Sequence, residues 1–342
     1  MGGAPLGGSG SAGSVTSAAF LAPPDTVHRL FDAPRLKRLA RLAQLRPEII
    51  APAQLEATLP ELSALEVIFS TWGMPFLTES QLDALPNLRA VFYAAGSVQS
   101  FARPLLERGI IVVSAWQANA VPVSEFTLAQ ILLATKGYFR NTREFHGTKA
   151  RTAFRGPGSY GEEVALLGAG AIGRRVIALL KPFALKVLVF DPFLSEEDAV
   201  ALGVEKVGLD AAFSRGFVVS NHLANNPQTV GMLTGAHFAK LRPGAVFINT
   251  GRGQTVIESE LVATLKARPD LTALLDVTWP EPCPLDSALW ELPGVRLSSH
   301  IAGSLNDETR RMADWCLDEF ECWQAGEPLR YAVTLEMLET MA

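Results

Sequence analysis

The feature that most constrains the fold is a glycine-rich turn between a strand-like and a helix-like segment. The apolar run Val164-Ala165-Leu166-Leu167 leads directly into Gly168-Ala169-Gly170-Ala171-Ile172-Gly173, and a helical pattern follows. In such a turn the first glycine permits the bend, the second lets a pyrophosphate approach the backbone, and the third lets helix and strand pack closely. The helix N-terminus offers N–H groups and a positive dipole end to phosphates. The segment therefore predicts a dinucleotide-binding fold, with Gly168, Gly170, Ala171, Ile172 and Gly173 at the cofactor.

An acidic residue after the next strand-like run agrees with this prediction. The run 186–190 ends at Asp191, which lies 191 − 173 = 18 residues after the last glycine. About 20 residues separate these positions when the acid binds the ribose hydroxyls of the cofactor. A carboxylate there also repels a 2′-phosphate, so NAD is the predicted cofactor. Because Arg174 and Arg175 stand just inside the helix, use of NADP as well stays open.

Strand-like runs alternate with helical stretches along the rest of the chain, which predicts parallel sheets with right-handed crossovers. Thr78-Glu79-Ser80-Gln81-Leu82 predicts a capped helix start. The expected strands are 67–69, 89–93 and 110–113 in the first part, and 164–167, 186–190, 217–220, 245–249, 271–275 and 295–297 in the second. Residues 141–161 are expected to form a loop or arm, because they contain several glycines and arginines.

The length of 342 residues favours about two domains. We expect a Gly-, Ser- and Ala-rich flexible tail over 1–19, a substrate domain over 20–122 plus 304–342, and a dinucleotide-binding domain over 123–303. The expected class is α/β, with two doubly wound parallel-sheet domains: a Rossmann NAD-binding domain and a flavodoxin-like substrate domain, with the active site in the cleft between them. The amphipathic stretch 307–324 is expected to return to the first domain.

Composition excludes several classes of partner. A net charge of −5 without long runs of one sign argues against nucleic acid, and no apolar run is long enough to span a bilayer. The three cysteines lack metal-ligand spacing and are expected to be free thiols in a reducing compartment, so no metal is predicted. Residues 1–19 lack a basic start and a firm apolar segment, so we expect no signal peptide and a cytoplasmic location.

Three later segments carry candidate catalytic residues. They are Ile248 to Gly253, Leu275 to Pro282, and Ser299 to Gly303, and each follows a strand of the second series. Ligands bind at the carboxyl edge of such sheets, where these segments should converge. An Arg, a Glu and a His together suit reversible reduction of a carbonyl: the Arg holds and polarises a keto acid, the His exchanges a proton, and the Glu orients the His.

With these residues the chain resembles the D-isomer-specific 2-hydroxyacid dehydrogenase family, from about Leu65 to Gly303. The resemblance implies that Arg252 binds the substrate carboxylate and carbonyl, that Glu281 hydrogen-bonds the catalytic histidine, and that His300 donates or accepts the proton. It therefore implies an NAD-dependent enzyme acting on a small 2-keto or 2-hydroxy acid.

The resemblance also implies further site residues. The backbone N–H groups of Ala95-Gly96-Ser97 would hold the substrate carboxylate, and the apolar helical stretch 123–139 would help to form a homodimer. The positions expected beside the cofactor are His222, Thr250, Asp276 and Gly303. The family usually has Thr-Pro-His where this chain has Ser298-Ser299-His300. The remaining histidines, His28, His146 and His237, are interpreted as structural.

The stretch Phe69 to Pro75 should lie at the open edge of the first domain. Family members acting on phosphorylated hydroxyacids commonly place an arginine there, whereas this chain offers Trp72 and Met74 with no basic residue near. Because Trp279 and Trp290 flank the Glu281 loop, we expect a non-phosphorylated substrate with an uncharged, apolar side chain. Formate dehydrogenases of this fold carry Gln in place of Glu281, which disfavours that chemistry. An NADH-sensing, corepressor-like protein remains the alternative.

Overall fold

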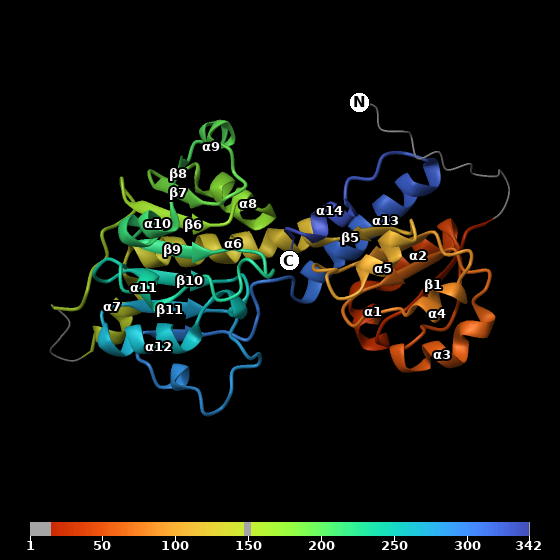
Figure 1. The fold of residues 1–342 in the computed structure, drawn as a ribbon, viewed down its shortest axis with the longest axis horizontal. Coiled ribbons are helices and arrows are strands. Elements are labelled where there is room, and N and C mark those ends of the chain that lie inside the picture. Colours follow the sequence, from red (N-terminus) through yellow and green to blue (C-terminus); the bar gives the residue numbers. More distant parts are fainter. Residues whose placement is uncertain (1–14, 147–151, 342) are drawn as a thin grey trace. The chain divides into compact units, whose positions relative to one another are not determined.

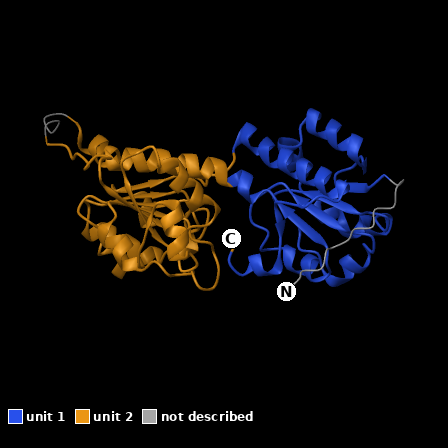
Figure 2. Cartoon of the chain, turned by 90° about the horizontal axis from the view of Figure 1, so that it is seen from above, with its two compact units in different colours: residues 1–119, 305–340, 342 blue, residues 120–304, 341 orange. Residues whose placement is uncertain are grey.

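The computed structural model describes residues 15–146 and 152–341. The chain divides into two compact units, shown in different colours in Figure 2. Of the described residues, unit 1 holds 15–119 and Leu305–Thr340, and unit 2 holds Ala120–Ser304 and Met341. Both are parallel α/β units, so the predicted fold class of two doubly wound domains is confirmed.

Unit 1 is built on a six-stranded sheet in the order β13-β5-β4-β3-β1-β2. The strands are β1 (Ser17–Phe20), β2 (Gln44–Leu45), β3 (Val67–Ser70), β4 (Ala90–Tyr93), β5 (Ile111–Ser114) and β13 (Ala332–Val333). The first five are parallel and follow the flavodoxin-like order 2-1-3-4-5, and β13 adds an antiparallel edge. The helices are α1 (Pro24–Leu30), α2 (Ala33–Leu42), α3 (Leu55–Thr58), α4 (Glu79–Asp83), α5 (Ala102–Glu107), α13 (Thr309–Ala325) and α14 (Leu335–Leu338).

Local sequence explains several of these boundaries, and one expectation was wrong. Helix α4 begins after Thr78, whose hydroxyl accepts from the N–H of Gln81 in a capping box, as predicted. The expected tail over 1–19 overlaps β1, because Ser17, Ala18 and Ala19 pair with β2 and β3. Residues 1–14 of that tail lie outside the described residues.

The core of unit 1 joins segments that are far apart in sequence. The ring of Phe69 on β3 lies 5.4 Å from that of Phe92 on β4 and 5.1 Å from that of Phe320 on α13, measured between centroids. All three side chains are fully buried. Burial of a phenylalanine side chain stabilises a fold by a few kcal/mol. Because Phe320 packs here, α13 belongs to the core of unit 1 even though it follows unit 2 in the chain.

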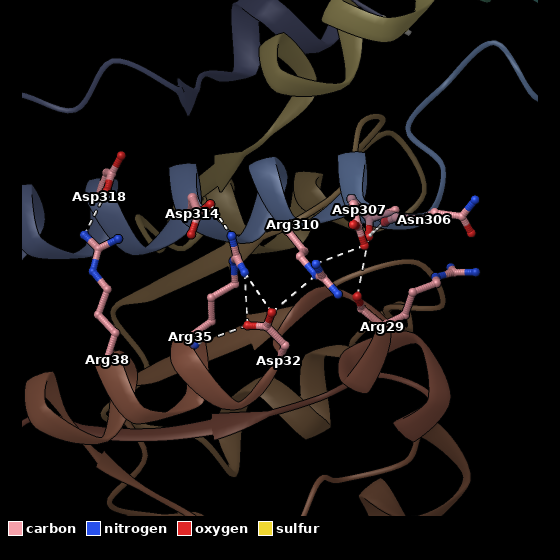
Figure 3. Close-up of polar contacts among 10 residues, drawn as sticks. Arg29, Asp32, Arg35, Arg38, Asn306, Asp307, Arg310, Asp314 and Asp318 are labelled. Carbon is pink, nitrogen blue, oxygen red and sulfur yellow. Dashed lines mark hydrogen bonds and ion pairs between the residues drawn. The ribbon is translucent and has the colours of Figure 1, made fainter.

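A row of ion pairs fixes the register of α13 on α2 (Figure 3). Arg35 of α2 bonds to Asp32 at 3.0 Å and to Asp314 of α13 at 2.5 Å, and Arg38 bonds to Asp318 at 2.7 Å. These side chains are partly exposed, so each pair contributes at most about 1 kcal/mol. The ion pairs therefore specify alignment, while the aromatic core supplies most of the stability.

Unit 2 is built on a seven-stranded parallel sheet in the order β12-β11-β10-β9-β6-β7-β8 (Figure 1). The strands are β6 (Glu163–Leu167), β7 (Lys186–Phe190), β8 (Glu205–Lys206), β9 (Val218–Asn221), β10 (Val246–Asn249), β11 (Thr272–Leu275) and β12 (Val295–Leu297). From β8 to β11 this is the Rossmann order 3-2-1-4-5-6, with β12 as a further strand. The six expected strands are present, and the two-residue β8 is added.

Helices cover both faces of this sheet. They are α6 (Trp116–Thr135), which begins in unit 1, α7 (Tyr138–Glu144), α8 (Ala171–Leu180), α9 (Glu196–Leu202), α10 (Leu209–Arg215), α11 (Gly235–Phe238) and α12 (Glu258–Ala267). Along β6, Val164 and Leu166 enter one core cluster, whereas Ala165 and Leu167 enter the other. A parallel strand buried on both faces is apolar throughout, which is why these strands were recognisable from sequence.

The expected loop over 141–161 was partly wrong, because α7 extends to Glu144. Residues 147–151 of that stretch lie outside the described residues. Within the two described ranges, no helix is long and apolar enough to cross a membrane.

Candidate active site

The glycine turn between β6 and α8 has the geometry expected of a phosphate-binding loop. A Cβ atom on Gly173 would lie 2.1 Å from the carbonyl oxygen of Gly168, so only glycine allows this approach of helix to strand. A Cβ on Gly170 would meet nothing within 4 Å, which means that the backbone there faces open space. Among the residues that the structure describes, no side chain caps the N-terminus of α8. The turn can therefore present backbone N–H groups to an anion.

Asp191 lies against this turn, at the end of β7. Its Oδ2 accepts from the N–H of Ala169 at 2.6 Å, and its Oδ1 accepts from the N–H of Phe193 at 2.8 Å. Arg174 also contacts the turn, since its Nε donates to the carbonyl of Ala169 at 3.0 Å. The carboxylate thus ties the glycine turn to the second strand, where a ribose would be expected.

His222, directly after β9, belongs to a buried chain of polar side chains. Its Nε2 lies 3.0 Å from the hydroxyl of Ser220, and its Nδ1 lies 3.4 Å from the hydroxyl of Thr250. Thr250 in turn lies 3.3 Å from the hydroxyl of Thr127 on α6. Burial lowers the pKa of His222 to about 4, so the imidazole is neutral at physiological pH. It acts as a hydrogen-bonding group and not as a cation.

Arg252 follows β10, in a loop that packs tightly against the loop after β11. A Cβ on Gly253 would lie 2.0 Å from the carbonyl oxygen of Thr278, so a glycine next to Arg252 is required for this packing. The guanidinium donates to the carbonyl of Gly251 at 2.8 Å. Burial lowers the pKa of Arg252, and the negative charge of Glu281 opposes that shift. Arg252 and Glu281 are therefore within electrostatic reach of each other.

Glu281 and His300 form a direct hydrogen bond of 2.6 Å between Oε1 and Nδ1. The two side chains are 37% and 45% exposed, so the pair is accessible to a ligand. Because Nδ1 is bonded to the carboxylate, the other ring nitrogen, Nε2, is the atom that can meet a substrate. The backbone of His300 has a φ of 57°, a left-handed conformation that a non-glycine residue adopts only when its surroundings hold it there.

Asp276, after β11, supplies that constraint. Its Oδ1 accepts from the hydroxyl of Ser298 at 2.6 Å and from the N–H of Ile301 at 2.9 Å, and its Oδ2 accepts from the N–H of Ala302 at 2.9 Å. Its backbone carbonyl also accepts from the N–H of His300 at 3.0 Å. The resemblance noted in the sequence implied that Asp276 lies beside the cofactor. The structure shows that its carboxylate, only 2% exposed, holds the histidine loop.

In unit 1, the loop Ala95-Gly96-Ser97 follows β4. The buried hydroxyl of Ser114 on β5 donates to the carbonyl of Ala95 at 3.0 Å and to that of Gly96 at 2.6 Å. In a trans peptide the N–H points opposite to the C=O, so holding these two carbonyls turns the N–H groups of Gly96 and Ser97 the other way. Sequence reasoning missed Ser114, because it lies in a different strand.

Two expectations about the segment after β3 need correction. Met74, expected to be available to a substrate, is only 7% exposed. The region near Trp72 was expected to lack a basic residue, but the guanidinium carbon of Arg29, from α1, lies 5.2 Å from the centroid of its ring. Arg29 precedes Trp72 by 43 positions (72 − 29), so the residues close to Trp72 in the sequence could not reveal it.

Two other predictions concern the remaining histidines and metals. His237 caps the short helix α11 by accepting from the N–H of Thr234 at 3.1 Å, a structural contact, and His28 and His146 are exposed. Among the described residues no group of three or more His, Cys, Asp or Glu side chains could hold a metal ion.

Comparison with known proteins defines the family. A family model for the NAD binding domain of D-isomer specific 2-hydroxyacid dehydrogenases matches residues 128–302, just over half of the chain. The (S)-sulfolactate dehydrogenase of Chromohalobacter salexigens is 31% identical over 235 residues, which are 68% of this chain and 76% of the relative. The chain therefore belongs to the D-isomer specific 2-hydroxyacid dehydrogenase family.

Other relatives are longer than this chain. The D-3-phosphoglycerate dehydrogenase of Mycobacterium bovis is 30% identical over 286 residues, 82% of this chain and 53% of the relative. This chain spans about half the length of that protein and of its counterpart from Archaeoglobus fulgidus, of which it covers 49%. The solved D-mandelate dehydrogenase of Rhodotorula graminis shares the fold, with a TM-score of 0.76 and 20% identity over 93% of this chain and 97% of that one.

The glycine turn yields a prediction with its own control. Gly173→Ala places a methyl group against the Gly168 carbonyl and should lower stability by about 1–3 kcal/mol. The methyl group of Gly170→Ala meets no atom of the described residues within 4 Å, so Tm should not change. NADH binding should weaken roughly tenfold or more, because the methyl group occupies the approach to the backbone. Thermal unfolding without cofactor and NADH fluorescence titration measure the two effects. Wild-type NADH affinity in Gly170→Ala would contradict this account of the turn.

Burial of His222 predicts a pH dependence of stability. The unfolded chain binds a proton at this residue near pH 6.5, whereas the folded protein binds it only near pH 4. Protonation therefore favours the unfolded state, and stability should fall as pH drops from about 6.5 to 4, by roughly 1 kcal/mol per pH unit. Above pH 7 the contribution is constant.

Denaturant unfolding of wild type and His222→Gln at several pH values measures this difference, because titration of the carboxylates affects both proteins equally. The variant should lose less stability than wild type between pH 6.5 and 4. Parallel pH profiles for the two proteins would show that the folded protein protonates His222 as readily as the unfolded chain does.

Proposed function

We propose that this chain is an NAD-dependent 2-hydroxyacid dehydrogenase that interconverts a small 2-keto acid and the corresponding 2-hydroxy acid. The observation that carries the proposal is the 2.6 Å hydrogen bond between Glu281 and His300, with Arg252 in electrostatic reach of the same glutamate. A carboxylate-oriented imidazole beside a guanidinium suits proton transfer to a carbonyl that is part of an anion.

The residues at the glycine turn fit NAD. The uncapped N-terminus of α8 and the open space at Gly170 suit a pyrophosphate, and the Asp191 carboxylate suits ribose hydroxyls and repels a 2′-phosphate. We expect His222, Thr250 and Gly303 to border the nicotinamide half of the cofactor. When bound, the nicotinamide ring accepts or delivers the hydride.

The roles of the chain's own residues follow from their positions. Arg252 would bind the substrate carboxylate and polarise the carbonyl, and His300 would give a proton from Nε2 in reduction and take it in oxidation. Glu281 holds the imidazole in this orientation through Nδ1. For the loop Ala95-Gly96-Ser97, we propose carboxylate binding by backbone N–H groups, and those of Gly96 and Ser97 are turned away from Ser114.

We further propose that the substrate is the D-isomer, non-phosphorylated and with an uncharged side chain. Trp72 follows β3 at the carboxyl edge of the unit 1 sheet, and Trp279, two positions before Glu281, is 56% exposed. Both offer apolar surface. Two relatives are named for 3-phosphoglycerate and sulfolactate, and Arg29 lies beside Trp72. Substrates with an anionic side chain must therefore be compared with those that have an uncharged one.

The test is NADH oxidation, followed by absorbance, against glyoxylate, pyruvate, phenylpyruvate, branched-chain keto acids and phosphohydroxypyruvate, with NADPH in parallel. We expect turnover with NADH, and with the uncharged keto acids in preference to the phosphorylated one. If phosphohydroxypyruvate is the best substrate, the side-chain proposal is wrong while the dehydrogenase proposal stands. Tight NADH binding without turnover of any keto acid would instead support a sensor.

Substitution of the histidine tests its role directly. His300→Ala should lower kcat at least about 100-fold, because proton transfer by a placed side chain contributes that much. The Kd for NADH should remain within about twofold, since the glycine turn is untouched. His146→Ala, at an exposed histidine outside the site, is the control. Lost NADH binding in His300→Ala would indicate a structural role for the residue.

We also propose that the chain forms a homodimer through the α6–α7 region. In the single chain Leu133 is 40% exposed and Tyr138 is 49% exposed, so apolar surface is left uncovered there. Sedimentation velocity at micromolar concentration should show twice the mass of one chain, and Leu133→Glu should shift it toward one. A wild-type monomer would contradict the proposal. The cytoplasmic location stays a prediction from composition.

A further inference from the structure

We propose that Asn221, Asn249 and Thr255 are positioning residues for Arg252, a buried set that we call the Arg252 clamp. The inference rests on the proposed function for its catalytic meaning, because Arg252 is the residue proposed to bind and polarise the keto acid. The clamp itself is defined by contacts within unit 2. None of its three members needs to touch the substrate for it to act.

The clamp holds the backbone of the arginine loop from both sides of one peptide. The carbonyl of Arg252 accepts from the hydroxyl of Thr255 at 2.8 Å and from Nδ2 of Asn249 at 3.3 Å. Oδ1 of the same asparagine accepts from the N–H of Gly251 at 3.1 Å. The side chain of Asn249 therefore holds both the N–H of Gly251 and the C=O of Arg252. These groups flank the peptide between the two residues, which leaves the loop little freedom to rotate.

Asn221, at the end of the neighbouring strand β9, connects the other two members. Its Nδ2 donates to Oδ1 of Asn249 at 3.0 Å and to the hydroxyl of Thr255 at 2.8 Å, and its Oδ1 accepts from the N–H of Leu223 at 3.2 Å. Reversing the oxygen and nitrogen of either amide would place donor against donor at the N–H of Leu223 or Gly251. The network is consistent in only one orientation, so it specifies one geometry.

The burial of these side chains shows that they do not contact a ligand directly. Asn221 and Thr255 are fully buried, and Asn249 is 1% exposed. Removing one partner from such a network leaves a donor or acceptor unsatisfied away from water, which costs about 1–3 kcal/mol. The most favourable response is movement of the loop, and the loop carries Arg252.

The guanidinium depends on this backbone. Its hydrogen bond is to the carbonyl of Gly251, the residue whose N–H Asn249 holds. A shift of residues 251–252 therefore moves the side chain together with its anchor. A misplacement of about 1 Å at a reacting centre can cost a large part of the rate, which makes the clamp a determinant of turnover.

Thr255 offers a matched pair of variants. Thr255→Val keeps the shape and removes the hydroxyl that bonds to the Arg252 carbonyl and to Asn221, whereas Thr255→Ser restores a hydroxyl. We expect kcat/KM for the best keto acid to fall roughly tenfold in Thr255→Val and to recover in Thr255→Ser. The Kd for NADH should stay within about twofold of wild type in both. An unchanged kcat/KM in Thr255→Val would overturn the proposal, as would equal loss in both variants.

A double-mutant cycle separates positioning from general structural damage. If Thr255 acts through the guanidinium, Thr255→Val should have little further effect in an Arg252→Ala background, because the group it positions is gone. A merely structural role would instead multiply the two losses. Multiplied losses in the cycle would overturn the proposal, whatever the effect on Tm.

A second readout does not depend on turnover. The ¹⁵N–¹H resonance of the Arg252 Nε, assigned by its absence in Arg252→Lys, should be sharp in wild type and Thr255→Ser, and broadened or shifted in Thr255→Val. If no keto acid is reduced, the proposed function fails, and this resonance still decides the clamp. A signal that is the same in Thr255→Val and wild type would overturn the clamp even in an active enzyme.

Discussion

The site in unit 2 depends on the register of five parallel strands. Leu167 of β6 pairs with Asn221 of β9, and that row continues across the sheet through β10 and β11 to β12. The residues that directly follow the row are Gly168, His222, Thr250, Asp276 and Ser298. One row of backbone hydrogen bonds therefore brings the glycine turn, the arginine loop and the histidine loop to the same edge, and a slip in register would separate them.

Buried polar side chains then convert this alignment into fixed loops. Asp276 holds the segment that carries His300 in an uncommon backbone conformation. In unit 1, Ser114 hydrogen-bonds to two carbonyls of the loop after β4. These groups are buried, so their hydrogen bonds do not compete with water, and losing one would leave an unsatisfied partner. The side chains of Glu281 and His300 are partly exposed, whereas Asp276 and Ser114 are buried.

The alternating strands and the glycine turn could be predicted from the sequence, because central strands such as β10 and β11 are buried on both faces and are mostly apolar. Arg252, Glu281 and His300 were identified as candidates from the motifs after the later strands, although β12, before His300, is an edge strand that is only partly buried. It did not predict the loop-holding role of Asp276, because that depends on hydrogen bonds to residues 22 or more positions away. Arg29 beside Trp72 was missed for the same reason. Local patterns give elements and motif residues, whereas pairings between distant segments require the fold.

The arginine loop and the histidine loop are held by different chemistry, and the difference has a physical reason. The histidine loop is anchored by a carboxylate, Asp276, that bonds to N–H and O–H donors. The arginine loop is held by neutral groups: two amides and a hydroxyl. A carboxylate at position 221 or 249 would lack the N–H donors that bond to Thr255 and to the carbonyl of Arg252, and it would be a buried charge without these partners. An amide both donates and accepts, so the two asparagines satisfy the hydrogen-bonding groups on both sides of the arginine loop without adding a buried charge.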